Sequence, residues 1–184
     1  MFYLRYICIA TALLYVSLLD VCAQDVNSKI KAIFIYNFTK YIEWPENQKQ
    51  GDFVIGILGN SNPGLVKELE KMASLSKIGG RNFSIKVYNN VDEIGKCQLL
   101  FVIADKSNLL SAAVQKVSKN NTLVIGENSG LIKKGAVINF VYQENKQKFE
   151  LSKINAEKSG LLVSSSLINM ASSSQIPLSI LQPS

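Results

Sequence analysis

Residues 33–46 read IFIYNFTKYIEWPE, and this stretch decides how the N-terminal part of the chain folds. From Ser28 to Glu43 the apolar side chains recur at three- and four-residue steps, which predicts a helix. Pro45 ends this helix because the residue before a proline is pushed out of the helical region. Trp44, the only tryptophan of the chain, stands directly before the proline.

The predicted helix is apolar over more than one side. One arc is expected to pack on a sheet; its members are Ile30, Phe34, Asn37, Phe38, Tyr41 and Trp44. Ile35 and Tyr36 lie outside that arc. Either the helix is buried on both sides by its own domain, or a second face centred on Tyr36 and Ile35 meets another protein, since exposed apolar area marks interfaces.

The rest of the chain alternates strand and helix patterns. Apolar or alternating runs predict strands within 52–59, 79–90, 97–105 and 121–127, and a hairpin over 136–152 that turns at 144–146. Helical patterns cover 60–75, 106–120 and 155–172, the last in two pieces broken near Gly160. We therefore expect a single α/β domain with a mixed, largely parallel sheet, flanked by helices and closed by a C-terminal antiparallel hairpin.

The N-terminal residues have the pattern of an export signal. Arg5 precedes an apolar run and small residues up to Ala23, which predicts a secretory signal peptide over residues 1–23. A lipoprotein anchored through Cys22 is the second interpretation, because Val21 is too bulky for a good lipobox. We expect a periplasmic domain over residues 24–175 and a loosely held tail over 176–184.

Composition argues against most catalytic chemistry. The chain has no histidine, the commonest general base and metal ligand. Cleavage after Ala23 leaves Cys97 as the one cysteine, and its place at the start of an apolar strand favours a buried structural thiol. The net charge of +6 comes from scattered lysines, which does not favour nucleic acid. We predict no enzyme, no cofactor and no metal.

Four stretches, taken together, resemble a known family. They are KAIFIYNFTKYIEWPE (31–46), FVIGILGNSNPG (53–64), GGRNFSIKVYNNVDEIGKCQLLFVIAD (79–105) and LVIGENSGLIKKGAVINFVYQENKQKFELSKINAEKSGLLVSSSLINMA (123–171). In this order they are similar to the YfiR-like family of secreted regulators. The resemblance implies a non-enzymatic periplasmic protein that binds the periplasmic sensor region of an inner-membrane diguanylate cyclase and represses it, lowering cyclic di-GMP and biofilm formation. Family members have several cysteines that can pair, so redox control through an internal disulfide does not carry over to a chain with Cys97 alone.

On this hypothesis the partner contacts involve Tyr36, Lys40 and Trp44, helped by Glu150, and Tyr36→Ala weakens binding without unfolding the domain. An alternative partner is a sensor histidine kinase. Association with a second copy of this chain as a homodimer is a further possibility. A different alternative is a periplasmic small-molecule-binding module, which would use the crevice at the strand ends near Gly59, Asn60 and Asp105. Neither alternative involves nucleic acid or a membrane-spanning segment.

Overall fold

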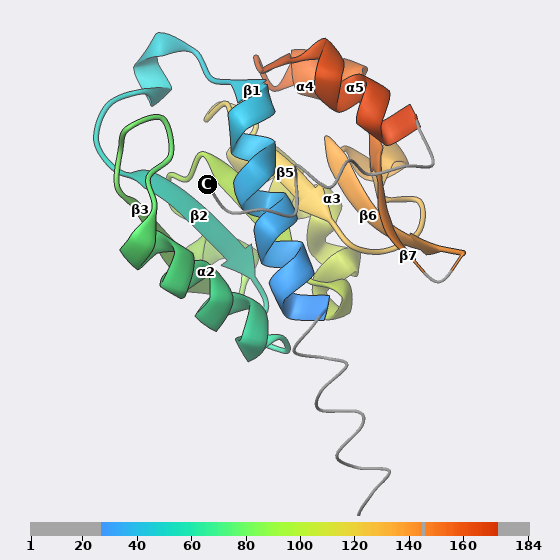
Figure 1. Ribbon diagram of the computed structural model, residues 1–184. Helices are drawn as coiled ribbons and strands as arrows, with labels where there is room; N and C mark the ends of the chain where they lie inside the picture. Colours follow the sequence, from blue (N-terminus) through green and yellow to red (C-terminus); the bar gives the residue numbers. More distant parts are fainter. Residues whose placement is uncertain (1–26, 145, 173–184) are drawn as a thin grey trace, which may run out of the picture.

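The computed structural model describes residues 27–144 and 146–172. Its first helix spans residues 27–41 and lies across one face of a six-stranded sheet (Figure 1). The predicted signal peptide (1–23) and the predicted tail (176–184) fall outside the described residues. None of the described helices combines the length and the apolar character needed to cross a bilayer.

The sheet has the strand order β3-β2-β4-β5-β6-β7. Its strands are β2 (Phe53–Leu58), β3 (Phe83–Tyr88), β4 (Leu99–Val102), β5 (Leu123–Gly126), β6 (Ile138–Gln143) and β7 (Lys146–Leu151). All neighbouring strands are parallel except β6 and β7, which are antiparallel. The predicted α/β fold with a largely parallel sheet and a C-terminal hairpin is therefore confirmed.

Helices cover both faces of the sheet. The first helix, α2 (Pro63–Leu75) and α5 (Ser165–Ser172) cover one face, and α3 (Leu110–Val117) covers the other (Figure 1). Side chains alternate along the strands, so Leu99 and Phe101 belong to the core under the first helix, whereas Leu100 and Val102 belong to the core under α3. This double burial explains why β4 and β5 are continuous apolar runs in the sequence.

The first helix is shorter than predicted. It ends at residue 41, because Ile42 and Glu43 form strand β1 (Ile42–Glu43), which pairs with β8 (Leu162–Val163). The N–H of Ser164 also donates to the carbonyl of Tyr41 at 2.9 Å. The expected extension of the helix to Glu43 is wrong, since pairing with a distant segment draws the chain out of the helix before Pro45 acts.

The C-terminal part contains the predicted break at Gly160. α4 (Lys153–Lys158) ends there, and β8 separates it from α5. Gly160 has φ +68, and a Cβ at this position would overlap the side-chain amide of Asn121. A residue with a side chain is therefore strained at this turn for two independent reasons.

Candidate functional site

The predicted inner arc of the first helix is buried, since Phe34, Asn37 and Phe38 are only 1–4% exposed, and the helix is buried on a second side as well. Ala32, Ile35 and Thr39 share one side of the helix and are 0%, 0% and 8% exposed, and Tyr36 beside them is 5% exposed. The expectation that Ile35 and Tyr36 form an exposed second face is wrong. The physical reason is that this side also faces the domain, where Ala32, Ile35 and Tyr36 belong to the core and Tyr36 packs against Phe83 of β3.

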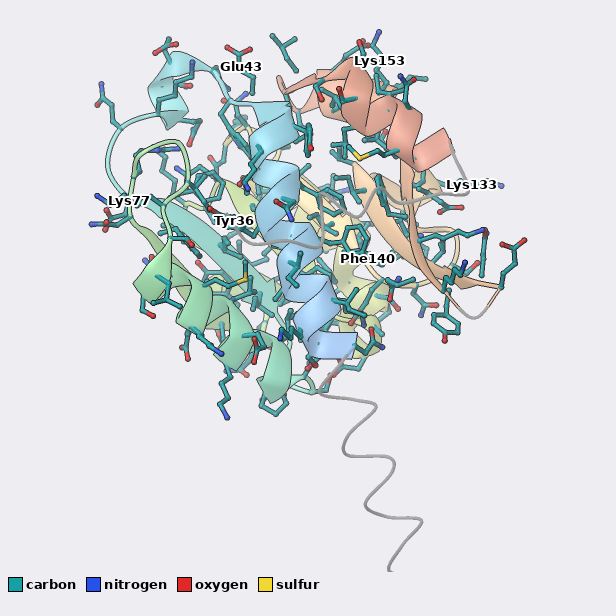
Figure 2. All side chains as sticks on the ribbon, in the orientation of Figure 1. Tyr36, Glu43, Lys77, Lys133, Phe140 and Lys153 are labelled. Atoms are coloured by element: carbon teal, nitrogen blue, oxygen red, sulfur yellow. The ribbon has the colours of Figure 1, made fainter. Side chains whose placement is uncertain are left out.

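Larger side chains pack to the two sides of this strip. Phe34 and Phe38 reach toward the β6–β7 hairpin, where their rings lie 4.9–6.1 Å from those of Phe140 and Phe149. Tyr36 reaches the other way, and Figure 2 shows it across the helix from Phe140. The helix is thus buried on more than one side by its own domain, as the first of the two sequence interpretations states.

Tyr36 is held by three contacts. Its ring centroid lies 6.0 Å from that of Phe83 on β3, and its hydroxyl donates to the carbonyl of Lys77 at 3.1 Å. The Lys40 ammonium lies 4.9 Å from the Tyr36 ring centroid, and Lys40 itself is exposed. Of this pair only Lys40 lies at the surface, and the buried Tyr36 ring contacts its ammonium group from the core side.

Trp44 is a core residue at the start of the loop that follows β1. It is 5% exposed, and its ring meets Phe53 edge-on at 5.1 Å between centroids. The indole N–H donates to the carbonyl of Gln98 at 3.1 Å. The Gln98 side chain in turn accepts from the N–H of Val54 at 2.8 Å and donates to the Gln48 side chain at 3.3 Å. These contacts tie residues 44–48 to the ends of β2 and β4, so Trp44 fixes the loop.

Glu150 lies on β7 and is exposed, but it does not share a face with the helix. Its neighbour Phe149 contacts the helix aromatics, and side chains alternate along a strand, so Glu150 points to the opposite face of the sheet. There it accepts a hydrogen bond of 3.0 Å from Asn139, a side chain with no exposed area. The four predicted contact residues therefore do not form one continuous surface.

Tyr142 is an exposed aromatic side chain that the sequence prediction missed. It is 69% exposed, and it follows Phe140 by two residues on β6, on the helix side of the sheet. The alternation of Ile138, Phe140 and Tyr142 is visible in the sequence. That alternation predicts a shared face but not that the last member projects beyond the helix.

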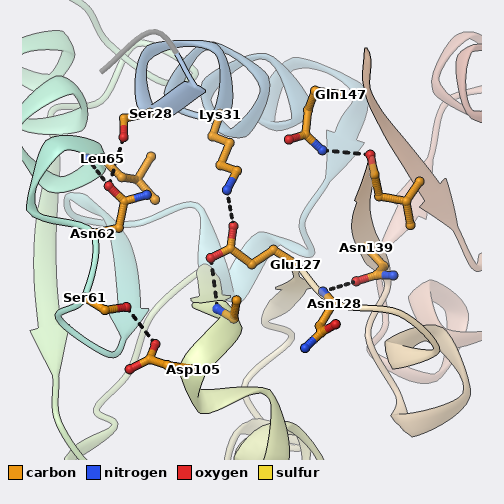
Figure 3. Close-up of polar contacts among 12 residues, drawn as sticks. Ser28, Lys31, Ser61, Asn62, Leu65, Asp105, Glu127, Asn128, Asn139 and Gln147 are labelled. Carbon is orange, nitrogen blue, oxygen red and sulfur yellow. Dashed lines mark hydrogen bonds and ion pairs between the residues drawn. The ribbon is translucent and has the colours of Figure 1, made fainter. Parts of the chain in front are cut away.

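The carboxyl ends of β2 and β4 meet as the small-molecule alternative requires. A Cβ built on Gly59 would lie 3.4 Å from the carboxylate of Asp105, and the Ser61 hydroxyl donates to that carboxylate at 2.8 Å (Figure 3). Asn60 points elsewhere, since its side chain donates to Asn89 at 3.4 Å. The structure thus brings Gly59 and Asp105 together, with the Ser61 hydroxyl bound to the Asp105 carboxylate beside them.

A buried ion pair joins the helix to the next strand end. Glu127, directly after β5, accepts from the Lys31 ammonium and from the N–H of Ala104, the latter at 2.9 Å (Figure 3). The two charged side chains are only 6% and 14% exposed. Nearby, Ser28 donates to Asn62 at 2.9 Å, and Asn62 caps α2 through the N–H of Leu65. These contacts fix the start of the first helix to the carboxyl edge of the sheet.

A pocket of about 320 Å³ opens between this ion pair and the hairpin. Its lining residues are Asn27, Lys31, Glu127, Phe140, Val141, Tyr142 and Gln147. This volume is at the lower end of the range for small-molecule sites. Within residues 27–144 and 146–172, no group of three or more His, Cys, Asp or Glu side chains is arranged to hold a metal ion.

Cys97 lies in the core behind β4, with no exposed area. Burial raises the pKa of its thiol to about 12, against which the hydrogen bond with Thr122 and the charge of Lys86 act only weakly. A thiol with this pKa is protonated at neutral pH and is a poor nucleophile. The structure therefore agrees with the prediction of a buried structural thiol.

The fold and the site define an α/β domain in which the Lys31–Glu127 ion pair fixes the first helix to the carboxyl edge of the sheet. The family model described as DUF4154, YfiR/HmsC-like, matches residues 28–172, and the chain belongs to this family. No curated protein matches the chain.

Among solved structures the chain is similar to a crystal structure of a conserved domain protein from Vibrio cholerae O1 biovar El Tor str. N16961. The identity is 12% and the TM-score is 0.47, over 64% of this chain and 53% of the Vibrio chain. This chain therefore spans about half the length of that protein. A TM-score of this size carries no weight for fold or function.

Proposed function

We propose that this protein is an exported, non-enzymatic regulator that binds the periplasmic sensor region of an inner-membrane signalling protein. The proposed partner is a diguanylate cyclase, whose repression lowers cyclic di-GMP and biofilm formation. Membership of the YfiR/HmsC-like family over residues 28–172 carries the proposal. The sequence supports the non-enzymatic part, since it contains no histidine.

The contact residues we propose are those that reach the surface. Lys40 is exposed on the first helix, Glu150 is exposed on β7, and Tyr142 adds an exposed aromatic side chain on β6. Tyr36 and Trp44 act indirectly, because they hold Lys40 and the loop after β1 in place. Since Lys40 and Glu150 point to opposite faces of the sheet, one partner reaches both only by wrapping around the β7 edge.

The mechanism we propose is differential binding. A regulator shifts a sensor toward its inactive state only by the difference between its affinities for the two states. Moving an equilibrium from about 1:99 to 99:1 needs a difference of roughly 10⁴-fold. This mechanism requires no covalent chemistry. It is compatible with a domain in which buried polar side chains such as Glu127 and Gln98 bind backbone groups and hold loops in place.

The test is site-specific photocrosslinking in intact cells. A photoreactive amino acid replaces Lys40, Glu150 or Tyr142, and Lys119, which is also exposed, serves as the matched control position. The expected result is a crosslink to an inner-membrane protein with a cyclase domain from the first three positions and not from Lys119. Loss of the protein should raise cyclic di-GMP, and Lys40→Glu should restore repression less well than Lys119→Glu.

Two results would contradict the proposal. Crosslinks to a sensor histidine kinase, with unchanged cyclic di-GMP, would replace the cyclase as partner. Absence of any membrane protein above an untagged control would favour the small-molecule module, for which the pocket beside Lys31 and Tyr142 is the supporting observation. A thermal-shift screen of the purified protein then identifies the ligand, because a bound ligand stabilises the folded state.

A further inference from the structure

Strand β3 forms one edge of the sheet, and no strand of the described residues pairs with its outer side. The opposite edge is β7, and each edge strand has a helix packed on its face, α2 on β3 and α5 on β7. β3 contains no proline and no bulge, and it is paired with β2 in continuous register from Phe83 to Tyr88. The two edges differ in charge, because β7 carries Glu150 beside its two lysines, whereas β3 carries Lys86 and no acidic residue.

The hydrogen bonds at the two ends of β3 show which backbone groups are available. The N–H of Phe53 donates to the carbonyl of Asn82 at 2.9 Å, and the N–H of Gly59 donates to that of Tyr88 at 2.8 Å. Because the two sides of a strand alternate, residues 82, 84, 86 and 88 direct their backbone groups toward β2. The N–H and C=O groups of Phe83, Ile85 and Val87 therefore point away from the sheet.

The side chains along this edge select the chemistry of a partner. Val87 is 41% exposed and lies on the same side of the strand as Ile85, whereas Lys86 is exposed on the other side. Residues 77–88 hold no acidic side chain, and Lys77 and Lys86 are exposed, whereas Arg81 is turned toward Gln48 and Phe53. We propose that the outer edge of β3 binds an extended, acidic segment of a partner protein as an added strand, with alternating apolar side chains beside Ile85 and Val87.

This surface differs from the one under Proposed function, and it does not require the partner to be a sensor. A second copy of this chain is disfavoured as the occupant, because it would bring the same exposed side chains, Lys77 and Lys86, to this edge, and like charges repel. An acidic extended segment brings the opposite charge.

The test uses the purified, ¹⁵N-labelled chain from residue 24 and the peptide acetyl-Thr-Val-Glu-Val-Glu-Val-Thr-amide, followed by NMR. The expected result is a change in the amide signals of Phe83, Ile85 and Val87 at up to millimolar peptide. The same peptide with Lys in place of Glu should bind more weakly. Val87→Pro, which deletes one outward N–H, should reduce affinity about tenfold, whereas Val87→Thr keeps that N–H and should bind like the wild type.

Controls separate binding from folding. Val87→Pro removes no bond to β2, so its cooperative thermal transition should persist. If that variant fails to fold, Lys86→Glu takes its place and should reverse the preference between the two peptides. The proposal is overturned if millimolar acidic peptide leaves these three amides unchanged or if Val87→Pro and Lys86→Glu bind like the wild type. It is also overturned if the same amides change with protein concentration alone, because a second copy would then be the occupant.

Discussion

Replacing Tyr36 by alanine should destabilise the domain strongly, which reverses the effect expected from sequence. The ring is 5% exposed and packs 6.0 Å from Phe83, and its hydroxyl donates to Lys77. A buried aromatic side chain removes about 150–250 Å² from water, or about 4–6 kcal/mol at 25 cal/mol per Å² as an upper estimate. Core aromatic-to-alanine substitutions cost about 3–5 kcal/mol. The two estimates agree, so we expect a loss of about 3–5 kcal/mol.

The assay is thermal unfolding of the purified chain from residue 24, followed by circular dichroism. For a domain of this size each kcal/mol lowers Tm by about 2–4 °C, so Tyr36→Ala should lower it by roughly 6–20 °C. Tyr36→Phe keeps the ring and loses only the hydrogen bond to Lys77, which costs about 0.5–1.5 kcal/mol. Lys40→Ala removes only the exposed cation over the ring and should cost about 1 kcal/mol or less.

The ordering of these variants is what tests the reasoning. If Tyr36→Ala unfolds within about 1 kcal/mol of the wild type, the ring is not a core element and the interface role of Tyr36 returns. If Lys40→Ala is as destabilising as Tyr36→Ala, the ammonium and not the ring carries the stability. Only the expected order, in which Tyr36→Ala has a much lower Tm than Tyr36→Phe, supports the burial of the Tyr36 ring in the core.

Two further predictions concern Trp44 and Cys97. Trp44→Phe keeps an aromatic ring beside Phe53 but loses the indole hydrogen bond to Gln98, so it should lower the free energy of unfolding by about 1–2 kcal/mol. Urea titration measures this change, and an unchanged midpoint would contradict the role of Trp44 in fixing the loop. The pKa of Cys97 is raised to about 12 from an ordinary value of 9.0, so the unfolded chain releases a proton that the folded chain keeps; the free energy of unfolding should fall as the pH rises from about 9 to 12. Cys97→Ala should show a smaller fall, and equal slopes for both proteins would refute this origin.

The sequence predicted the sheet because its signals are local and strong. β2, β4 and β5 are short apolar runs bounded by turn residues, and burial on both faces produces that pattern. The hairpin was also predictable, since apolar residues alternate on both sides of residues 144–146. These elements follow from patterns that lie within a few residues of each other.

The orientation of the first helix was predictable only in part. Its periodicity placed Phe34 and Phe38 on the inner arc, and they pack against Phe140 and Phe149. A helix with apolar residues all round has no single stripe, so the pattern did not show that the side of Tyr36 is buried too, by Phe83 far along the chain. The same holds for its end, where β8 pairs with β1.

The burial of Tyr36 and Trp44 changes how a mutation in the aromatic helix is to be interpreted. A variant at either position that loses regulation does so through lost fold stability or a displaced loop, and its phenotype says nothing about the partner contact. Lys40 and Tyr142 are informative instead, because they are exposed and their substitution leaves the core packing intact. A regulatory defect at these positions with an unchanged Tm would place the partner on the helix side of the sheet, and a defect at Glu150 alone would place it on the other.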